Sequence, residues 1–268
     1  MQDVIARGRN DLRHEPIGQR VRATVGEDAV VDSTRAVVVW EPRRIVPSYA
    51  VPAADIGADL SPAPAADRDV PGMLHPGIPF EVHTAAGEPV TIGDRAGAGF
   101  RLADRDLDGY VVLDFDAFDG WYEEDERIAG HPRDPFHRVD VRRSSRAVRI
   151  ELDGDLLAES TRARMLFETG LPVRFYLPRE DVRLELHPSP RRTYCPYKGE
   201  ASYWSVDAGG RRRKDLGWSY EQPLPDGPPV TGLVAFWNER VDVSLDGERL
   251  ERPGGPFAEA LRNEFGVG

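Results

Sequence analysis

Cysteine, secretory signals and long apolar runs are all scarce or missing in this chain of 268 residues. The single cysteine, Cys195, excludes an internal disulfide and a zinc site built from several cysteines. No run approaches the length of apolar residues that a membrane-spanning helix needs, so no membrane partner is expected. The first residues lack the apolar stretch of a secretory signal. Together these absences predict a cytoplasmic protein.

Lysine is also scarce, and basic charge is missing from the first half. Residues 1–140 hold 15 arginines, no lysine and 26 acidic residues, whereas residues 141–268 balance 20 basic with 20 acidic residues. Binding to a nucleic-acid backbone needs a basic face that displaces counterions, so no nucleic-acid partner is expected. Only Lys198 and Lys214 occur beside 33 arginines. Each lysine is therefore mildly informative, because the two cations differ in chemistry.

A pattern of the first half recurs in the second at an offset of 127 residues. Three pairs of segments match in the same order: 30–36 with 157–163, 38–41 with 165–168, and 49–56 with 175–182, the last one residue out of step. The first pair shares a Ser-Thr-Arg-Ala core. Collinear matches with small shifts are typical of a duplication followed by small deletions. We therefore expect two related domains, 1–138 and 139–268.

The periodicity of both halves favours strands. Residues 20–25 and 147–152 alternate polar and apolar side chains, and each segment leads into a turn rich in Gly and Asp. Further strands are expected at 173–177, 182–186, 233–237 and 241–245, with residues 238–240 as a hairpin loop between the last two. With 26 Gly and 23 Pro, long helices are improbable, and only 161–167 and 256–265 are candidate helices. The fold class expected is mainly β, as two tandem small all-β domains with few short helices.

Four short motifs stand close together in the second half. Residues 195–199 read Cys-Pro-Tyr-Lys-Gly, and Ser-Tyr, Trp-Ser-Tyr and Val-Ala-Phe-Trp follow at 202–203, 218–220 and 234–237. This set resembles the domain of unknown function 427 family, strongly over residues 145–252 and weakly over 13–140. The resemblance implies a small all-β domain with barrel-like or tent-like sheets, and it implies no established reaction. The corresponding stretch of the first half, 79–88, has no Cys, no Lys and no aromatic pair. We therefore expect the first domain to be a degenerate copy that serves as a scaffold or as a dimer-like partner.

Cys195 and Lys198 are the candidate catalytic residues. They stand three positions apart, and an ammonium near a thiol favours the thiolate. A cysteine nucleophile also needs a base. The candidate bases are His187, Glu168, Glu180 and Asp181. The alternative is that Cys195 is a small buried residue and that Lys198 pairs with a nearby carboxylate, Glu180, Asp181 or Glu200.

Aromatic side chains are the second constellation of the motif region. They are Tyr194, Tyr197, Tyr203, Trp204, Trp218, Tyr220, Phe236 and Trp237. Several of these rings on paired strands could line a pocket that, with a lysine, would hold a planar or cationic ligand. The alternative is an ordinary packing cluster between sheets. The candidate ligand-binding residues are Tyr197, Glu200, Tyr203, Trp204, Trp218 and Tyr220.

Other polar patterns point to no chemistry of their own. The spacing of Asp104, Asp106 and Asp108 resembles a calcium loop, but the flanking helices and the closing Glu are missing. The glycines at 209–210 mark a hairpin tip, and the basic run 211–214 after them is expected to be a solvated turn, with an anion or nucleic-acid patch as the alternative. No metal and no cofactor are expected. The functional expectation is a small-molecule-binding module with its site in the second domain, with a Cys195 enzyme or a structural or protein-interaction module as alternatives. The oligomeric state stays open.

Overall fold

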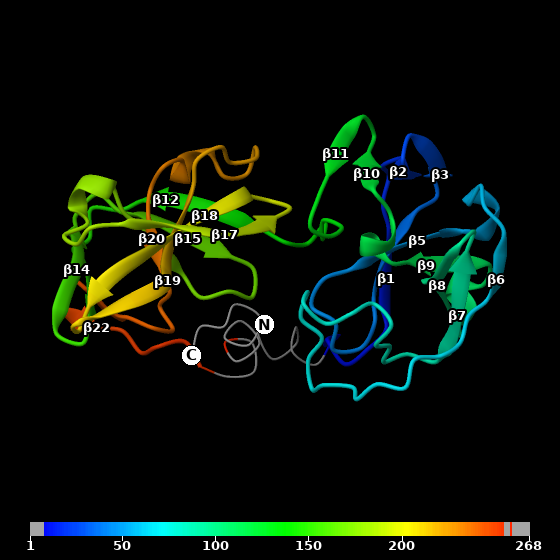
Figure 1. The fold of residues 1–268 in the computed structure, drawn as a ribbon, viewed down its shortest axis with the longest axis horizontal. Coiled ribbons are helices and arrows are strands. Elements are labelled where there is room, and N and C mark those ends of the chain that lie inside the picture. The colour runs from blue at the N-terminus through cyan, green and yellow to red at the C-terminus, as the bar shows by residue number, and fades with distance from the viewer. Residues whose placement is uncertain (1–7, 255–257, 259–268) are drawn as a thin grey trace. The chain divides into compact units, whose positions relative to one another are not determined.

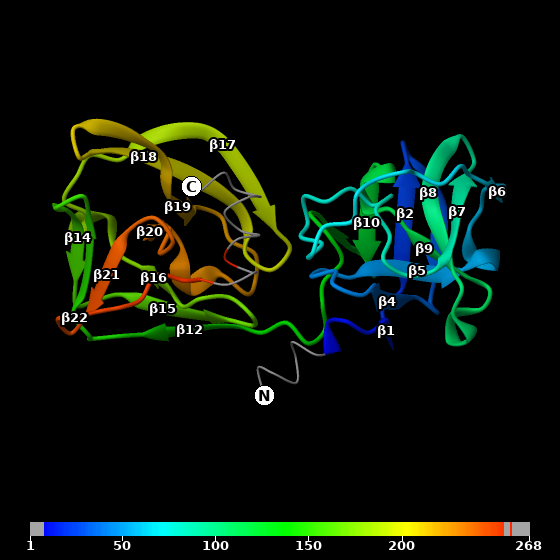
Figure 2. The same ribbon diagram turned by 90° about the horizontal axis from the view of Figure 1, so that it is seen from below.

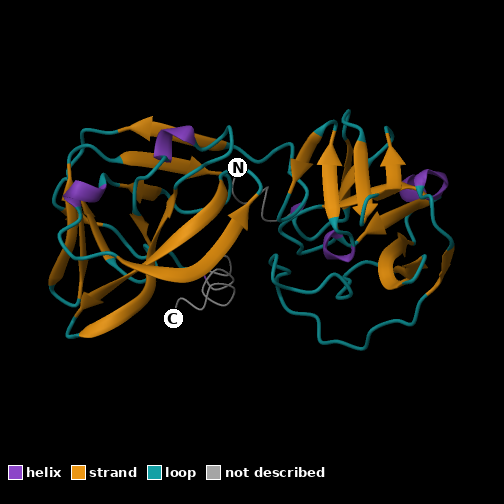
Figure 3. Ribbon diagram, turned by 45° about the horizontal axis from the view of Figure 1, so that its top comes forward, coloured by secondary structure: helices purple, strands orange, loops and turns teal. Residues whose placement is uncertain are grey.

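The structure, a computed structural model, describes residues 8–254 and residue 258. The chain divides into two compact units, Met1–Pro135 (unit one) and Phe136–Gly268 (unit two), whereas the sequence places the boundary after residue 138. Strands make up both units, and the helices shown in Figure 3 are single 3-10 turns. The expected mainly β fold class is therefore confirmed. Among the described residues, no helix has the length and apolar character needed to cross a membrane.

Unit one contains a seven-stranded sheet in the order β1-β4-β5-β9-β8-β7-β6 and a four-stranded sheet in the order β11-β10-β2-β3 (Figure 1). The strands are β1 (Arg13–Pro16), β2 (Val21–Val25), β3 (Asp28–Ser33), β4 (Val37–Trp40), β5 (Ser48–Pro52), β6 (Leu60–Pro62), β7 (Gly87–Ile92), β8 (Arg95–Leu102), β9 (Tyr110–Leu113), β10 (Gly120–Glu123) and β11 (Glu126–Ile128). The 3-10 turns are η1 (Ala53–Asp55), η2 (Arg105–Leu107) and η3 (Phe115–Ala117).

Unit two contains three sheets, ordered β12-β15-β16, β17-β18-β19-β20 and β14-β13-β21-β22 (Figure 2). The strands are β12 (Val139–Arg143), β13 (Val148–Leu152), β14 (Asp155–Ser160), β15 (Arg164–Glu168), β16 (Arg174–Tyr176), β17 (His187–Cys195), β18 (Gly199–Ala208), β19 (Arg211–Tyr220), β20 (Ala235–Phe236), β21 (Asp242–Leu245) and β22 (Glu248–Arg249). The 3-10 turns are η4 (Arg179–Asp181) and η5 (Pro228–Val230).

The two units have the same strand order when β12 is aligned with β1, β13 with β2, and so on to the end of each unit. The ladder between β5 and β9 is reduced in unit two to one bridge, Leu177 to Val234, between the ends of β16 and β20. That single difference divides the long sheet of unit one into two shorter sheets in unit two. The turns η1 and η4 likewise follow β5 and β16.

A network of one serine, one arginine and one aspartate occurs at the same place in each unit. Its members are Ser33, Arg35 and Asp55 in unit one and Ser160, Arg162 and Asp181 in unit two. The serine hydroxyl donates to the aspartate at 2.6 Å in both units. The arginine guanidinium donates to the other carboxylate oxygen at 2.5 Å in unit one and 2.7 Å in unit two. The serine and the arginine of the repeated Ser-Thr-Arg-Ala sequence therefore hold the aspartate of the 3-10 turn in each unit.

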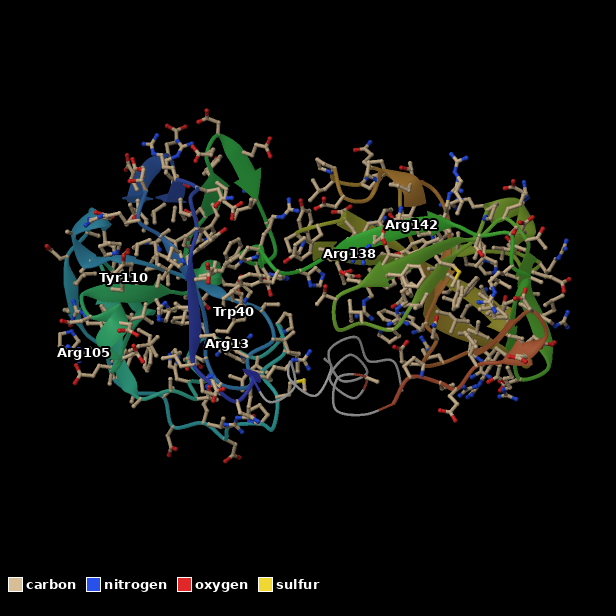
Figure 4. The ribbon with its side chains drawn as sticks, turned by 180° about the vertical axis from the view of Figure 1, so that it is seen from behind. Arg13, Trp40, Arg105, Tyr110, Arg138 and Arg142 are labelled. Carbon is tan, nitrogen blue, oxygen red and sulfur yellow. The ribbon has the colours of Figure 1, made fainter. Side chains whose placement is uncertain are left out.

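Alternation along the strands supplies two apolar faces in each unit, because neighbouring side chains of a strand point to opposite sides. In unit one, Val38 belongs to one core cluster and its neighbours Val37 and Val39 belong to the other. Both faces of the long sheet are covered, so β4 is buried along its whole length. Complete burial of a valine or leucine side chain stabilises a fold by roughly 1.5–3 kcal/mol. At the sheet edge, the Arg13 guanidinium on β1 lies 5.3 Å from the Trp40 ring on β4 (Figure 4).

Three local predictions are wrong. Residues 161–167 do not form a helix; Arg164–Glu168 is strand β15, which pairs with β12 on one side and β16 on the other. Pairing on both sides overrides the weak local helix signal. Residues 182–186 do not form a strand, because only Val182 makes a bridge, to Ala158, after the turn η4.

The expected hairpin across 238–240 is also wrong. The strand β20 pairs with β19, and β21 pairs with β13 in another sheet. A turn closed by the Arg240 N–H and the Trp237 carbonyl, at 2.8 Å, passes the chain from one sheet to the other. The candidate helix 256–265 lies outside the described residues except for residue 258.

Candidate functional site

The Cys-Pro-Tyr-Lys-Gly segment closes the hairpin of β17 and β18. Cys195 ends β17 and pairs with Gly199, the first residue of β18, so residues 196–198 form the tip. Gly199 has a φ of +93°, and a Cβ there would lie 3.3 Å from the backbone nitrogen of Leu224. That nitrogen donates to the carbonyl of Lys198 at 3.1 Å. The glycine is thus required by the left-handed turn and by the close approach of the neighbouring loop.

The side chain of Lys198 points into the unit and meets Glu168, the last residue of β15. Its Nζ lies 2.5 Å from both carboxylate oxygens. The two side chains are 8% and 5% exposed. His137 reaches the same carboxylate, with Nε2 2.9 Å from Oε1. We call these three residues the Glu168–Lys198–His137 cluster.

Electrostatics keep the cluster charged. Burial raises the pKa of Glu168, but the charge of Lys198 and the hydrogen bonds from His137 and Lys198 outweigh it and lower the pKa to about 2. Burial lowers the pKa of Lys198, yet the carboxylate of Glu168 outweighs it, and the pKa lies above its ordinary value. At neutral pH the cluster therefore contains a desolvated carboxylate and a desolvated ammonium in direct contact.

The segment before β12 holds His137 in place. Arg138 and Thr169 exchange two hydrogen bonds, from the Arg138 N–H to the Thr169 hydroxyl at 2.9 Å and from the Thr169 N–H to the Arg138 carbonyl at 3.0 Å. Arg138 and Arg142 both pair with Asp140 on β12 (Figure 4). These contacts extend the β12–β15 pairing, so His137 and Glu168 lie side by side.

The geometry also fixes which nitrogen of His137 is available. An ionised Glu168 can only accept, so Nε2 of His137 carries the donated proton. Among the residues that the structure describes, no group hydrogen-bonds to Nδ1. One face of the ring stacks on Tyr197 at a centroid distance of 4.4 Å. The imidazole is thus oriented by two neighbours and keeps one nitrogen available.

Buried aromatic and ionic side chains form the floor behind the cluster. The Trp218 Nε1–H donates to the Tyr176 hydroxyl at 3.0 Å. Burial raises the pKa of Tyr176 to about 12. Arg174 makes two 2.8 Å hydrogen bonds to Glu239, and its guanidinium lies 5.6 Å from the Trp218 ring centroid. All four of these side chains belong to buried residues.

Cys195 has no base on its sulfur among the residues that the structure describes. The thiol is half-buried and lies close enough to Lys198 to raise the pKa of that ammonium. Within the described part of the chain, no hydrogen bond to the sulfur is present. His187 instead contacts Asp207 at 3.4 Å, and Asp181 holds Ser160.

The other candidate partners are used elsewhere. Glu180 lies 3.2 Å from Arg162, and the exposed Glu200 lies 3.7 Å from Arg192. The expected pairing of Lys198 with Glu180, Asp181 or Glu200 is therefore wrong. Glu168 takes that place because the hairpin tip lies over the end of β15.

The aromatic candidates divide between two packing clusters. Tyr203 and Trp204 are neighbours on β18 and so point to opposite faces. Tyr203, Trp218 and Tyr220 pack in one buried cluster, whereas Trp204 packs against the other. Trp204 also lies under the Arg179 guanidinium at 4.3 Å. Tyr197 is buried against His137. The rings therefore do not line one common pocket.

The sequence reasoning named Glu168 only as a candidate base for Cys195; it missed the pairing of Glu168 with Lys198 and the presence of His137. A signal for Glu168 existed, since Glu41 stands at the matching position of the first half and is buried too. Glu41 accepts from His83 Nδ1 at 2.9 Å and from the backbone N–H groups of Thr84 and Ala85. Each unit therefore carries a buried glutamate with a histidine on it.

Few groups of side chains among the described residues could hold a metal ion or a cofactor. His14, Asp104 and Asp106 bring ligand atoms within 4.8 Å of one another. None of the three is buried, and Asp104 already accepts from the Asp106 N–H at the start of η2. In unit two, an open apolar cavity of about 270 Å³ lies beside Met165, Phe175 and Val243.

The strand order and the charged hairpin tip define unit two as an all-β domain built around a buried ion pair. Residues 140–247 match a family whose description is Domain of unknown function (DUF427). Over these residues unit two is similar to that family, as the motifs predicted. No curated protein matches the chain.

Proposed function

We propose that unit two is a small-molecule-binding module whose site is the 195–199 tip and the Glu168–Lys198–His137 cluster behind it. The observation that carries this proposal is the burial of the cluster directly under the family motif. Desolvating each ion costs several kcal/mol, and apolar residues often stabilise such a place better. Groups with strongly shifted pKa values also concentrate at functional sites. Glu168 and Tyr176 both show such shifts.

The ligand would be read by the groups that the cluster leaves available. His137 Nδ1 accepts a hydrogen bond from a hydroxyl or N–H group of the ligand. Tyr194, which precedes Cys195 on β17 and is 42% exposed, offers a ring for a planar body. Lys198 acts through Glu168 rather than on the ligand, because both carboxylate oxygens hold its ammonium.

A second candidate function is an enzyme with Cys195 as nucleophile. The proximity of the thiol to the ammonium of Lys198 supports it. It ranks lower because no base on the sulfur accompanies the thiol within the described residues.

We also propose that the two units arose by duplication and that the protein is cytoplasmic. The common strand order and the repeated serine–arginine–aspartate network support the duplication. The free cysteine is consistent with a reducing compartment.

The test is a fragment screen by NMR on the full chain, followed by titration of the hits on variants. Fragments that perturb residues 194–199 are expected to bind His137→Phe at least ten-fold more weakly. Lys214→Met is the matched control, because it alters the other lysine, which is exposed, and it should bind like the unaltered chain. Cys195→Ser should bind normally if unit two is a binding module.

Two outcomes oppose the proposal. Hits that map away from the tip, or that bind His137→Phe with unchanged affinity, contradict it. A covalent adduct on Cys195 that forms with activated esters and turns over would support the enzyme instead.

A further inference from the structure

Unit one has a cavity of its own where the chain connects β6 to β7. This connection spans residues 63–86, whereas the corresponding connection in unit two spans only 196–198. The longer loop, together with β7 and β8, lines an open cavity of about 370 Å³. Its lining includes Ala65, Arg68, Glu81, Val82, His83 and Phe100. Cavities of about 300–1,000 Å³ are the size that small molecules occupy.

His83 provides the polar group at this cavity, and Glu41 orients it. Burial raises the pKa of Glu41, but the hydrogen bond and charge of His83 and the Thr84 N–H outweigh it, so the net pKa is lowered. The carboxylate is therefore ionised and accepts at 2.9 Å from Nδ1 of His83. The side chain of Glu41 is 4% exposed. This contact fixes the tautomer that carries its proton on Nδ1.

The rest of the ring is held by aromatic contacts, and its second nitrogen is left available. The imidazole stacks on Phe100 at a centroid distance of 3.6 Å, and Phe80 meets it edge-on at 5.0 Å. Within the described residues, Nε2 has no hydrogen-bond partner, and it is not among the fully buried polar atoms. In a neutral ring with Nδ1 protonated, Nε2 is an acceptor.

The remaining lining decides the character of the ligand. Arg68 and Glu81 form an ion pair with each other, so the charges of the lining compensate within the protein. The other lining side chains are alanines, prolines, valines, glycines and Phe100. A charged ligand would lose hydration here without a partner of its own. An apolar body with one donor for Nε2 matches the lining.

We propose that unit one binds a small, uncharged, mostly apolar molecule whose hydroxyl donates a hydrogen bond to His83 Nε2. The first unit is then a second binding site, built from a loop that unit two does not have. This site replaces the expected scaffold role of the first domain, and it does not depend on the site in unit two.

The experiment titrates 4-methylphenol and 4-methylanisole into the full chain and follows backbone amides by NMR. The two probes differ at one group: the hydroxyl that would donate to Nε2 in the phenol is a methoxy group, which cannot donate, in the ether. The phenol is expected to shift residues 82–87 and to bind about ten-fold more tightly than the methyl ether, as one hydrogen bond allows. Equal affinities for both probes, or shifts confined to other residues, would overturn the proposal.

Two variants sharpen the result. His83→Phe keeps a ring against Phe100 but removes Nε2, so the phenol should lose its ten-fold advantage. His75→Phe, in the same loop but outside the cavity lining, should leave the advantage unchanged. An advantage that persists in His83→Phe contradicts the proposal. The comparison of the two probes on the unaltered chain needs no variant and decides the matter if His83→Phe does not fold.

Discussion

Units one and two share a strand order and differ in the ladder between the fifth and ninth strands and in the connection between the sixth and seventh. In both, a glutamate at the end of the fourth strand has a buried, ionised side chain: Glu41 after β4 and Glu168, the last residue of β15. In unit one the carboxylate is satisfied by His83 and two backbone N–H groups of a long loop. In unit two it is satisfied by Lys198 from a short tip and by His137. The same buried charge has thus been compensated in two ways.

The comparison shows which residues determine the fold and which determine the candidate site. The residues that hold turns and strands together recur in both units, as the serine–arginine–aspartate network does. The groups around the buried carboxylate do not recur. His83 and Lys198 come from the connection between the sixth and seventh strands, which differs between the units, and His137 comes from the segment before β12. A buried carboxylate is costly unless it is paired. Each unit must therefore supply partners for its own carboxylate.

The largest effect is expected from breaking the ion pair of unit two. Lys198→Met leaves Glu168 buried and poorly compensated, which should lower the free energy of unfolding by about 3–5 kcal/mol. The double variant Glu168→Gln, Lys198→Met should recover part of the loss. Urea unfolding with hydrogen-exchange readout measures each unit separately. The loss should be confined to unit two, and Lys214→Met, the matched control, should change stability by less than about 0.5 kcal/mol.

The next largest effect is expected on the stability of unit two at acidic pH. The pKa of Glu168 falls from 4.5 to about 2 on folding. The contribution of ionised Glu168 to the free energy of unfolding is thus fully present above pH 4.5. It is lost as the pH falls towards 2, which lowers the free energy of unfolding by about 3 kcal/mol. Unfolding of unit two, measured between pH 5 and 2, should show this slope. In Glu168→Gln the slope should be weaker, and an unchanged slope would show that other groups carry it.

A smaller effect is expected at two corresponding glycines. Gly99 on β8 and Gly217 on β19 face β9 and β20, and an added Cβ would lie 2.7 Å from Val111 and 2.9 Å from the Ala235 carbonyl. Overpacking of this kind typically costs about 1–3 kcal/mol. Gly99→Ala and Gly217→Ala should each destabilise their own unit in urea unfolding. A loss in only one unit would contradict the correspondence between the strands.

The smallest effect is expected at the repeated network. Ser33→Ala and Ser160→Ala each remove one hydrogen bond to an aspartate, which should cost about 1–2 kcal/mol. Because both aspartate side chains are 16% exposed, the two losses should agree within about 0.5 kcal/mol. Unfolding midpoints of the two variants give the comparison. Losses that differ by more than this would show that the networks are not equivalent.

Much of the fold was predictable because its signals are local. Strands β2 and β13 follow directly from alternating side chains, and the motif at 195–199 indicated the family. Residues 161–167 were misassigned because β15 depends on its partners β12 and β16. Long-range pairing of that kind leaves no local pattern.

The candidate site was less predictable for the same reason. Lys198 lies 30 positions after Glu168 in the sequence, and His137 lies 31 positions before it. Sequence proximity instead favoured Glu180, Asp181 and Glu200. The cavity of unit one was hidden as well, since residues 63–86 contain no motif that indicates a binding loop. The matching positions of Glu41 and Glu168 were the signal available.

The central claim is that each unit uses a buried, ionised glutamate to hold one nitrogen of a histidine. Long-range proton–nitrogen NMR of the histidine rings, assigned with His83→Phe and His137→Phe, tests this directly under conditions where the rings are neutral. The structure predicts opposite tautomers: His83 with its proton on Nδ1 and His137 with its proton on Nε2. The same tautomer in both rings, or rapid exchange between tautomers in either, would contradict the account.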